Sequence, residues 1–208
     1  MTRSVICVSH QPGAGGRDLA AAVAEQLGYR YVDEEVVTSA AAAEELTVEE
    51  LADVERRKSF FSRLMLDYGR SSGVMYAAAG VPAEIVTGLP TSDQLRAAIR
   101  RAIEAIADQG RVVIVSHAAS HALVGDQVLR VLVVAPDDVR IARIADAADG
   151  DRKAATRQLA DHDAGRRDYL KRFYDIDEES PDQYDLVVNT GSIDPTSFAS
   201  LVVGAADL

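Results

Sequence analysis

The sequence predicts a single α/β domain built on a parallel β-sheet. Short apolar segments alternate along the chain with segments of helical periodicity, as expected for consecutive β-α-β units. Apolar residues make up 48% of the composition, aromatic residues only 5%, and tryptophan is absent. The core must therefore be built from Val, Ile, Leu and Ala, a composition typical of parallel strands covered by helices. The length of 208 residues fits one such domain.

The first strand is predicted at residues 5–8, which are all apolar. A helix is predicted over residues 17–27, because its leucine and valine residues recur at four-residue spacing and Gly28 suits the C-cap. Residues 29–32 then predict a second short strand, which ends at Asp33.

The region that follows is less regular. The capping-box pattern Thr47-Val48-Glu49-Glu50 predicts the start of a helix. Residues 56–90 mix aromatic side chains and methionines with several glycines. This mixture favours short helices and loops that move against the core.

The last part of the chain returns to regular patterns. A second capping box, Thr91-Ser92-Asp93-Gln94, opens a predicted helix with isoleucines on one face and charged residues on the other, and Gly110 ends it. Asp194-Pro195 is an N-cap followed by proline at the first helical position, which predicts a terminal helix. The remaining strands are predicted at residues 112–115, 128–134 and 185–189.

A glycine-rich loop, Ser9-His10-Gln11-Pro12-Gly13-Ala14-Gly15-Gly16-Arg17-Asp18, joins the first predicted strand to the first predicted helix. Backbone N–H groups at such a loop and helix N-terminus favour an anion, and glycines let the backbone curve closely around phosphates. Against the standard P-loop pattern, Gly16 stands at the lysine position and Arg17 at the Ser/Thr position. The hydroxyl that holds Mg²⁺ is therefore missing, and Asp18 is a candidate replacement. Spacing alone is equally compatible with a phosphate site and with a tight turn.

A basic segment occupies residues 152–172, with seven basic and three acidic side chains in a protein of net charge −11. Such a segment suits a mobile arginine lid that clamps phosphates. It also suits a solvated helix with i,i+4 ion pairs such as Asp163–Arg167.

Several classes of function are disfavoured. A net charge of −11 makes the chain a poor general binder of nucleic acid or of anionic membranes. The one cysteine, Cys7, lies in an apolar run and is expected to be a buried core residue rather than a reactive thiol. No apolar run is long enough to span a membrane, no secretory signal is evident, and no His, Asp or Glu spacing suggests a structural metal site. A cytoplasmic location is expected.

Four motifs in chain order resemble the cytidylate kinase-like family, within the nucleoside-monophosphate kinase branch of the P-loop NTPases. The resemblance runs along nearly the whole chain. The motifs are Gly13-Ala14-Gly15-Gly16-Arg17, Tyr31-Val32-Asp33-Glu34-Glu35, Asp163-Ala164-Gly165-Arg166 with Tyr169 and Arg172-Phe173-Tyr174, and Tyr184-Asp185-Leu186-Val187-Val188-Asn189-Thr190.

The resemblance implies a P-loop three-layer αβα sandwich with a five-stranded parallel sheet. In the single domain, 1–208, the core would comprise residues 1–35, 92–150 and 184–208. Residues 36–91 would form a helical monophosphate-binding insert, and residues 151–175 would form the lid. A nucleotide would bind at the carboxyl ends of the strands.

The resemblance also implies the roles of individual residues. ATP, with Mg²⁺, would bind residues 13–18, namely Gly13, Ala14, Gly15, Gly16, Arg17 and Asp18. Arg17, Asp163 and Arg166 would act on the transferring group. Asp33, His117 and Arg172 would contact a nucleoside monophosphate. The reaction would be in-line phosphoryl transfer, in which the protein positions groups and neutralises charge.

The chain departs from the family pattern after residue 115, where Ser116-His117-Ala118 stands in place of the usual Gly-Arg-Gly. A neutral histidine is a poor substitute for a charged guanidinium. His10 and His117 end neighbouring strands in this fold, so they either strengthen phosphate binding below about pH 6.5 or are simple polar loop residues.

Alternatives to an active kinase are a nucleotide sensor without turnover and an interaction protein with a vestigial site. The kinase hypothesis predicts that Arg17→Ala and Arg166→Ala each abolish transfer and leave the fold intact. The acceptor and the oligomeric state are not predicted.

Overall fold

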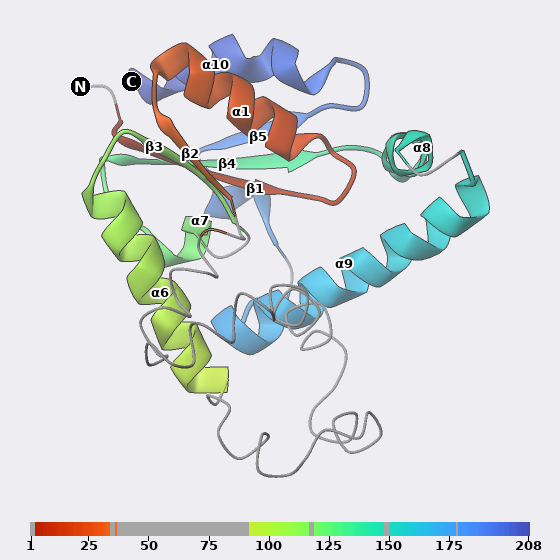
Figure 1. The fold of residues 1–208 in the computed structure, drawn as a ribbon, viewed down its shortest axis with the longest axis horizontal. Coiled ribbons are helices and arrows are strands. Elements are labelled where there is room, and N and C mark those ends of the chain that lie inside the picture. The colour runs from red at the N-terminus through yellow and green to blue at the C-terminus, as the bar shows by residue number, and fades with distance from the viewer. Residues whose placement is uncertain (1–2, 34–35, 37–91, 117–118, 148–149, 178) are drawn as a thin grey trace, which may run out of the picture.

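The computed structural model describes residues 3–33, 36, 92–116, 119–147, 150–177 and 179–208, and confirms the predicted fold class (Figure 1). In these residues five parallel strands form one sheet in the order β2-β3-β1-β4-β5. The strands are β1 (Val5–His10), β2 (Arg30–Asp33), β3 (Val112–Val115), β4 (Val128–Val134) and β5 (Leu186–Asn189). The helices are α1 (Gly16–Leu27), α6 (Ser92–Asp108), α7 (Ala119–Ala122), α8 (Asp137–Asp146), α9 (Arg152–Tyr174) and α10 (Ala199–Ala206), with 3₁₀ turns η1 (Pro181–Gln183) and η2 (Pro195–Phe198).

The helices cover both faces of the sheet, which gives three layers (Figure 1). Helices α1 and α10 pack on one face, where Ile6 and Val8 of β1 join their core cluster. Helices α6 and α7 pack on the other face, with Val5 and Cys7. Successive strand residues point to opposite faces, so the fully apolar β1 supplies both cores.

Strand β1 lies at the centre of the sheet, between β3 and β4. Val8 of β1 is in register with Val115 of β3, and His10 is in register with Val133 of β4. Because all strands are parallel, the glycine loop after β1 and helix α8 after β4 meet at one edge (Figure 1). β1 continues into α1 on one face of the sheet, and its neighbour β3 continues into α7 on the other face. The point where the connections diverge in this way is the usual position of a ligand crevice in an open α/β sheet.

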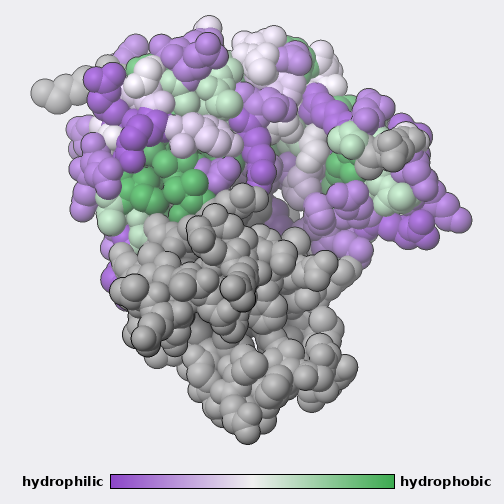
Figure 2. Space-filling view, viewed as in Figure 1, coloured by the Kyte–Doolittle hydropathy of each residue, from purple (hydrophilic) through white to green (hydrophobic). Residues whose placement is uncertain are grey.

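The basic segment forms one helix, α9, of 23 residues. Asp151 caps its N-terminus by accepting hydrogen bonds from Lys153 N and Ala154 N, and Asp175 ends it with a φ of 55°. The part of α9 at the right of Figure 2 presents mainly hydrophilic residues. Among the side chains of α9 that the structure describes, the buried ones lie on one stripe along the helix, which consists of Ala155, Leu159, Arg166 and Leu170. The helix is therefore docked along one face rather than solvated all round.

The structure refines several predicted elements. Strand β1 runs two residues further, to His10, and η2 precedes the terminal helix α10. Helices α7 and α8 were not predicted. The capping box at Thr47, the proposed insert apart from Val36, and His117 lie outside the described residues.

Cys7 is confirmed as a buried core residue. It is fully buried, and burial raises the pKa of its thiol to about 12. Within the described part of the chain, no helix combines the length and apolar composition that a membrane crossing requires.

Candidate phosphate-binding site

The loop between β1 and α1 needs its glycines for backbone conformation and for close packing. Gly13 and Gly15 have φ angles of 77° and 76°, in the left-handed region that strains other residues. A Cβ atom on Gly13 would lie 2.8 Å from the carbonyl oxygen of Arg140. A Cβ atom on Gly15 would collide with the ring of Pro195. The loop is therefore fixed by α8 on one side and by η2 on the other.

The packing of His10 explains why a glycine, Gly16, stands at the lysine position of the standard P-loop pattern. The His10 side chain lies against the first turn of α1, and a Cβ atom on Gly16 would collide with it. Burial is the largest influence on the His10 imidazole and lowers its pKa to about 4. A neutral His10 at physiological pH favours the alternative that this residue does not supply a charge that strengthens phosphate binding below about pH 6.5.

Three consecutive carbonyl groups of the loop, those of residues 12–14, accept hydrogen bonds from side chains. Arg140 Nε donates to the first at 2.9 Å and Arg143 Nη1 donates to the second at 3.4 Å. Thr190 Oγ1, which is fully buried after β5, donates to the third at 2.7 Å. Arg143 also donates to Thr190, to Oγ1 at 2.9 Å and to the carbonyl oxygen at 2.7 Å.

The opposite side of the loop offers N–H groups. No side chain caps α1 at its N-cap, Gly15. The first N–H groups of any helix lack partners within the helix, and here they belong to Gly16, Arg17 and Asp18. Arg17 and Asp18 are exposed. The arrangement suits an anion, because these N–H groups and the helix dipole both favour negative charge.

Asp33 lies at the carboxyl end of β2 and accepts a hydrogen bond from Val36 N at 3.2 Å. Burial raises the pKa of the nearby Tyr31 phenol, and the charge of Asp33 raises it further. The charges of Arg17 and Asp18 act on the same phenol. Asp33 is thus brought to the α1 side of the glycine loop.

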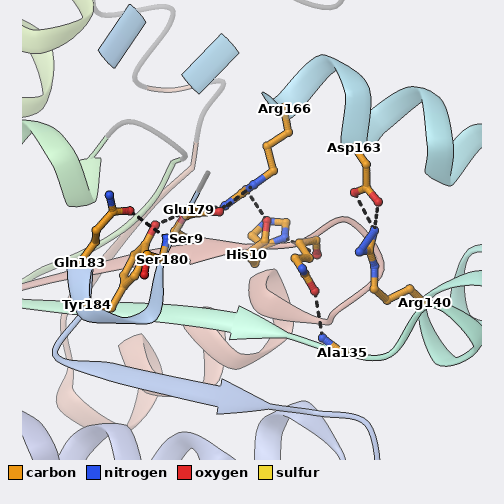
Figure 3. A network of polar contacts seen from close by, with 11 residues as sticks. Ser9, His10, Ala135, Arg140, Asp163, Arg166, Glu179, Ser180, Gln183 and Tyr184 are labelled. Atoms are coloured by element: carbon orange, nitrogen blue, oxygen red, sulfur yellow. Dashed lines mark hydrogen bonds and ion pairs between the residues drawn. The ribbon is translucent and has the colours of Figure 1, made fainter. Parts of the chain in front are cut away.

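Asp163 does not form its ion pair with Arg167. Its carboxylate accepts two hydrogen bonds of 2.6 Å from Arg140 Nη2 (Figure 3). The Arg140 side chain is only 3% exposed. Asp163 of α9 therefore neutralises the arginine that binds the loop carbonyl of Pro12.

Arg166 reaches from α9 to the end of β1 (Figure 3). It forms an ion pair with Glu179 and donates to Ser9 Oγ at 3.0 Å and to the His10 carbonyl at 2.5 Å. The residue is 8% exposed. Its guanidinium is thus held among protein groups in this conformation.

Glu179 is the acceptor at the centre of this network. Arg166 binds Glu179 Oε2, and the hydroxyl groups of Tyr184 and Ser9 donate to Glu179 Oε1, that of Ser9 at 3.1 Å. Burial raises the pKa of Glu179, but the charge of Arg166 and these hydrogen bonds outweigh burial, so the pKa lies below its ordinary value. The network fastens α9 to the sheet through a charged pair.

The structure brings residues 13–18 and Asp33 to one edge, and joins Asp163 and Arg166 to that edge through other side chains. Arg172 lies on α9, but its side chain is not among those that the structure describes. Sequence reasoning gave no role to four residues that build the site, namely Arg140, Arg143, Glu179 and Thr190. A signal existed for Thr190, which directly follows an apolar strand. The i,i+3 arginines after the fourth strand were a weaker signal.

No group of three or more His, Cys, Asp or Glu side chains in the described ranges is arranged to hold a metal ion. Mg²⁺ in nucleotide sites typically takes one or two carboxylates and completes its shell with phosphate and water oxygens. Asp18 in the first turn of α1 and Asp33 at the end of β2 are carboxylates at this edge of the sheet.

The sequence matches the model of the cytidylate kinase-like family over residues 5–192. A cytidylate kinase from Archaeoglobus fulgidus is 24% identical over 204 residues, covering 98% of this chain and 94% of that protein. A cytidylate kinase from Methanocaldococcus jannaschii is 31% identical over 111 residues, covering 52% of this chain and 62% of that protein. The chain thus aligns with less than two thirds of the latter relative.

Two solved structures share the fold. An uncharacterized protein from Eubacterium ventriosum has a TM-score of 0.69 at 15% identity, over 99% of this chain and 98% of that one. TT1252 from Thermus thermophilus has a TM-score of 0.52 at 17% identity, over 100% of this chain and 99% of that one. At these identities the similarity establishes the fold alone.

Proposed function

The chain belongs to the cytidylate kinase-like family, and from this premise we propose that it transfers the terminal phosphoryl group of ATP to a nucleoside monophosphate. The observation that carries the proposal is the uncapped N-terminus of α1 behind a loop whose carbonyls at residues 12–14 accept hydrogen bonds from protein side chains. Such a loop is suited to bind phosphates through its amides.

The triphosphate would lie along residues 13–18, with the exposed Arg17 supplying positive charge at the first turn of α1. Mg²⁺ bound to the phosphates would neutralise part of their charge and orient them for in-line transfer. Asp18 and Asp33 are the carboxylates proposed to approach this ion.

The acceptor would bind between Asp33, the proposed insert of residues 36–91 and the proposed lid of residues 151–175. Within this division of the domain, His117 and Arg172 are the proposed contacts to the acceptor. Asp163 and Arg166 would act on the transferring group only after exchanging their present partners, Arg140 and Glu179. The proposed partner is a small-molecule nucleotide and the proposed location is the cytoplasm, where such nucleotides are found.

The test is a coupled assay of ADP release with ATP, Mg²⁺ and a panel of nucleoside monophosphates that includes CMP. Turnover with one or more monophosphates is the expected result, and Gly15→Ala should abolish it because a side chain there collides with Pro195. Gly204→Ala is the matched control, because it changes a glycine of α10 with nothing within 4 Å of the added Cβ. No turnover with any monophosphate would refute the kinase proposal.

A second candidate is a nucleotide sensor that binds without turnover. The observation in its favour is Gly16 at the lysine position, with His10 filling the space where a side chain would project. This candidate predicts that ATP or one monophosphate raises the unfolding temperature of the protein, while the coupled assay detects no ADP release. A ligand at 100 times its Kd adds about 2.7 kcal/mol of stability, which thermal unfolding detects easily.

A further inference from the structure

On the basis of the proposed function, we propose that Thr190 is a positioning residue for phosphate binding: supported by Arg143, it holds the Ala14–Gly15 peptide in the orientation that turns the Gly15 N–H toward the phosphates. Thr190 contacts no reacting atom in this proposal. It acts through the backbone of the loop.

A hydrogen bond to the carbonyl of a peptide group also fixes the direction of the N–H in the same peptide group. Carbonyl and N–H groups of one trans peptide point in opposite directions. Thr190 Oγ1 holds the Ala14 carbonyl at 2.7 Å, which directs the Gly15 N–H to the other side. Arg143 Nη1 holds the Gly13 carbonyl at 3.4 Å, and the N–H of that peptide, on Ala14, donates to the Gln11 carbonyl at 3.0 Å, so it is the Gly15 N–H that is left to face a ligand.

The hydroxyl of Thr190 is fully used. It donates to the Ala14 carbonyl and accepts from Arg143 Nη1 at 2.9 Å, so one group links the loop to α8. Thr190 is 0% exposed, and its own N–H donates to the Val134 carbonyl at 2.9 Å. Strands β4 and β5 therefore fix the hydroxyl before any ligand arrives.

Fixing the Ala14–Gly15 peptide in advance matters because Gly15 adds backbone freedom on one side of it. Glycine populates positive and negative φ almost equally, so the φ of Gly15 offers little resistance to rotation of this peptide. A rotated Ala14–Gly15 peptide would present a carbonyl oxygen to the phosphates and repel them. Preorganised donors avoid that cost at the moment of binding.

Arg143 adds a favourable charge. In the described ranges no carboxylate lies within ion-pair distance of its guanidinium, whereas Arg140 beside it is neutralised by Asp163. Arg140 also pairs with Asp137 at 3.5 Å, so it is the Arg143 charge, on the carbonyl side of the loop, that favours an anion on the amide side.

The experiment compares Thr190→Val with Thr190→Ser in the full-length chain. Valine has the same shape without the hydroxyl, and serine restores the hydroxyl. Binding of pyrophosphate and of ATP is measured by calorimetry well below the unfolding temperature. The Gly13 and Gly15 amide resonances are followed by NMR during the pyrophosphate titration. Ser200→Ala is the control, because it removes an exposed hydroxyl of α10, which donates to Gln26 Oε1 at 3.3 Å, outside the proposed site.

We expect Thr190→Val to raise the Kd for both ligands about 10-fold, equivalent to about 1.4 kcal/mol. The KM of the monophosphate acceptor should not change. Thr190→Ser and Ser200→Ala should bind like the wild type. The Gly15 amide resonance should shift on binding in the wild type and in Thr190→Ser, and should shift less in Thr190→Val.

A Thr190→Val protein that unfolds at a lower temperature but binds both ligands with wild-type Kd would overturn the positioning role and leave a purely structural one. If Thr190→Val does not fold, Thr190→Ser and Arg143→Lys are measured instead. Arg143→Lys keeps the charge but loses the forked contacts to Thr190. A wild-type Kd in Arg143→Lys would overturn the positioning role of Thr190. If the wild type itself binds neither ligand, the proposed function fails, and the positioning role fails with it.

Discussion

Replacing Arg166 by alanine is expected to destabilise the fold strongly. The guanidinium forms an ion pair with Glu179 and donates to Ser9 and to the His10 carbonyl, at 8% exposure. Arg166→Ala leaves the Glu179 carboxylate buried without its counter-charge. The sequence-based expectation that this variant keeps the fold intact is therefore replaced by one of lost stability.

The magnitude follows from the burial of the pair. Removing one partner of a buried ion pair costs about 3–5 kcal/mol, compared with about 0–1 kcal/mol for an exposed pair. For a domain of 208 residues, this corresponds to a fall in Tm of about 6–20 °C. Hydrogen bonds from Tyr184 and Ser9 to Glu179 remain and place the effect at the lower end of that range.

The pH dependence gives an independent check. In the wild type the pKa of Glu179 lies below its ordinary value of 4.5, so the pair stabilises the fold above that pH and the contribution is lost as pH falls through the lowered pKa. In Arg166→Ala burial dominates, and the pKa of Glu179 rises. The difference in stability between the two proteins should therefore be largest near pH 7 and should shrink below pH 4.5.

The assay is urea unfolding followed by circular dichroism at several pH values. Arg166→Met with Glu179→Leu is the matched control, because an apolar pair of similar volume avoids the unpaired charge and should recover most of the stability. A loss below about 1 kcal/mol in Arg166→Ala, or one that is independent of pH, would refute the reasoning.

Three further predictions concern single residues. Gly165→Ala in α9 should raise the free energy of unfolding by about 0.5–1 kcal/mol, because nothing lies within 4 Å of the added Cβ; a loss of stability in urea unfolding would contradict this. His10 should titrate with a pKa of about 4 in NMR experiments, and because burial lowers this pKa, the fold should lose stability as pH falls from about 6.5 toward 4; a midpoint near 6.5 would show an exposed ring. Cys7 should resist a thiol reagent in the native protein and react only after unfolding, because its thiol is buried with a pKa of about 12; rapid native labelling would disprove this.

Local patterns predicted the secondary structure well. The strands at residues 112–115 and 128–134 have the predicted bounds, and the helix after Thr91 buries Ile99, Ile103 and Ile106. These successes have one cause, because the spacing of apolar residues follows the period of the element they form. Helix α8 was missed, since its ten residues contain two buried positions, and one is an arginine.

The sequence by itself determined the strands, most of the longer helices and the position of the glycine loop, because neighbours along the chain decide those features. Only the tertiary structure decided the partners of charged and hydroxyl groups. Asp163 binds Arg140 rather than Arg167, because a largely buried pair, in which Arg140 Nη2 donates to both carboxylate oxygens, is stronger than an exposed i,i+4 pair. Thr190 reaches a loop carbonyl 176 residues away, and such a contact exists only once β1 and β5 share a sheet.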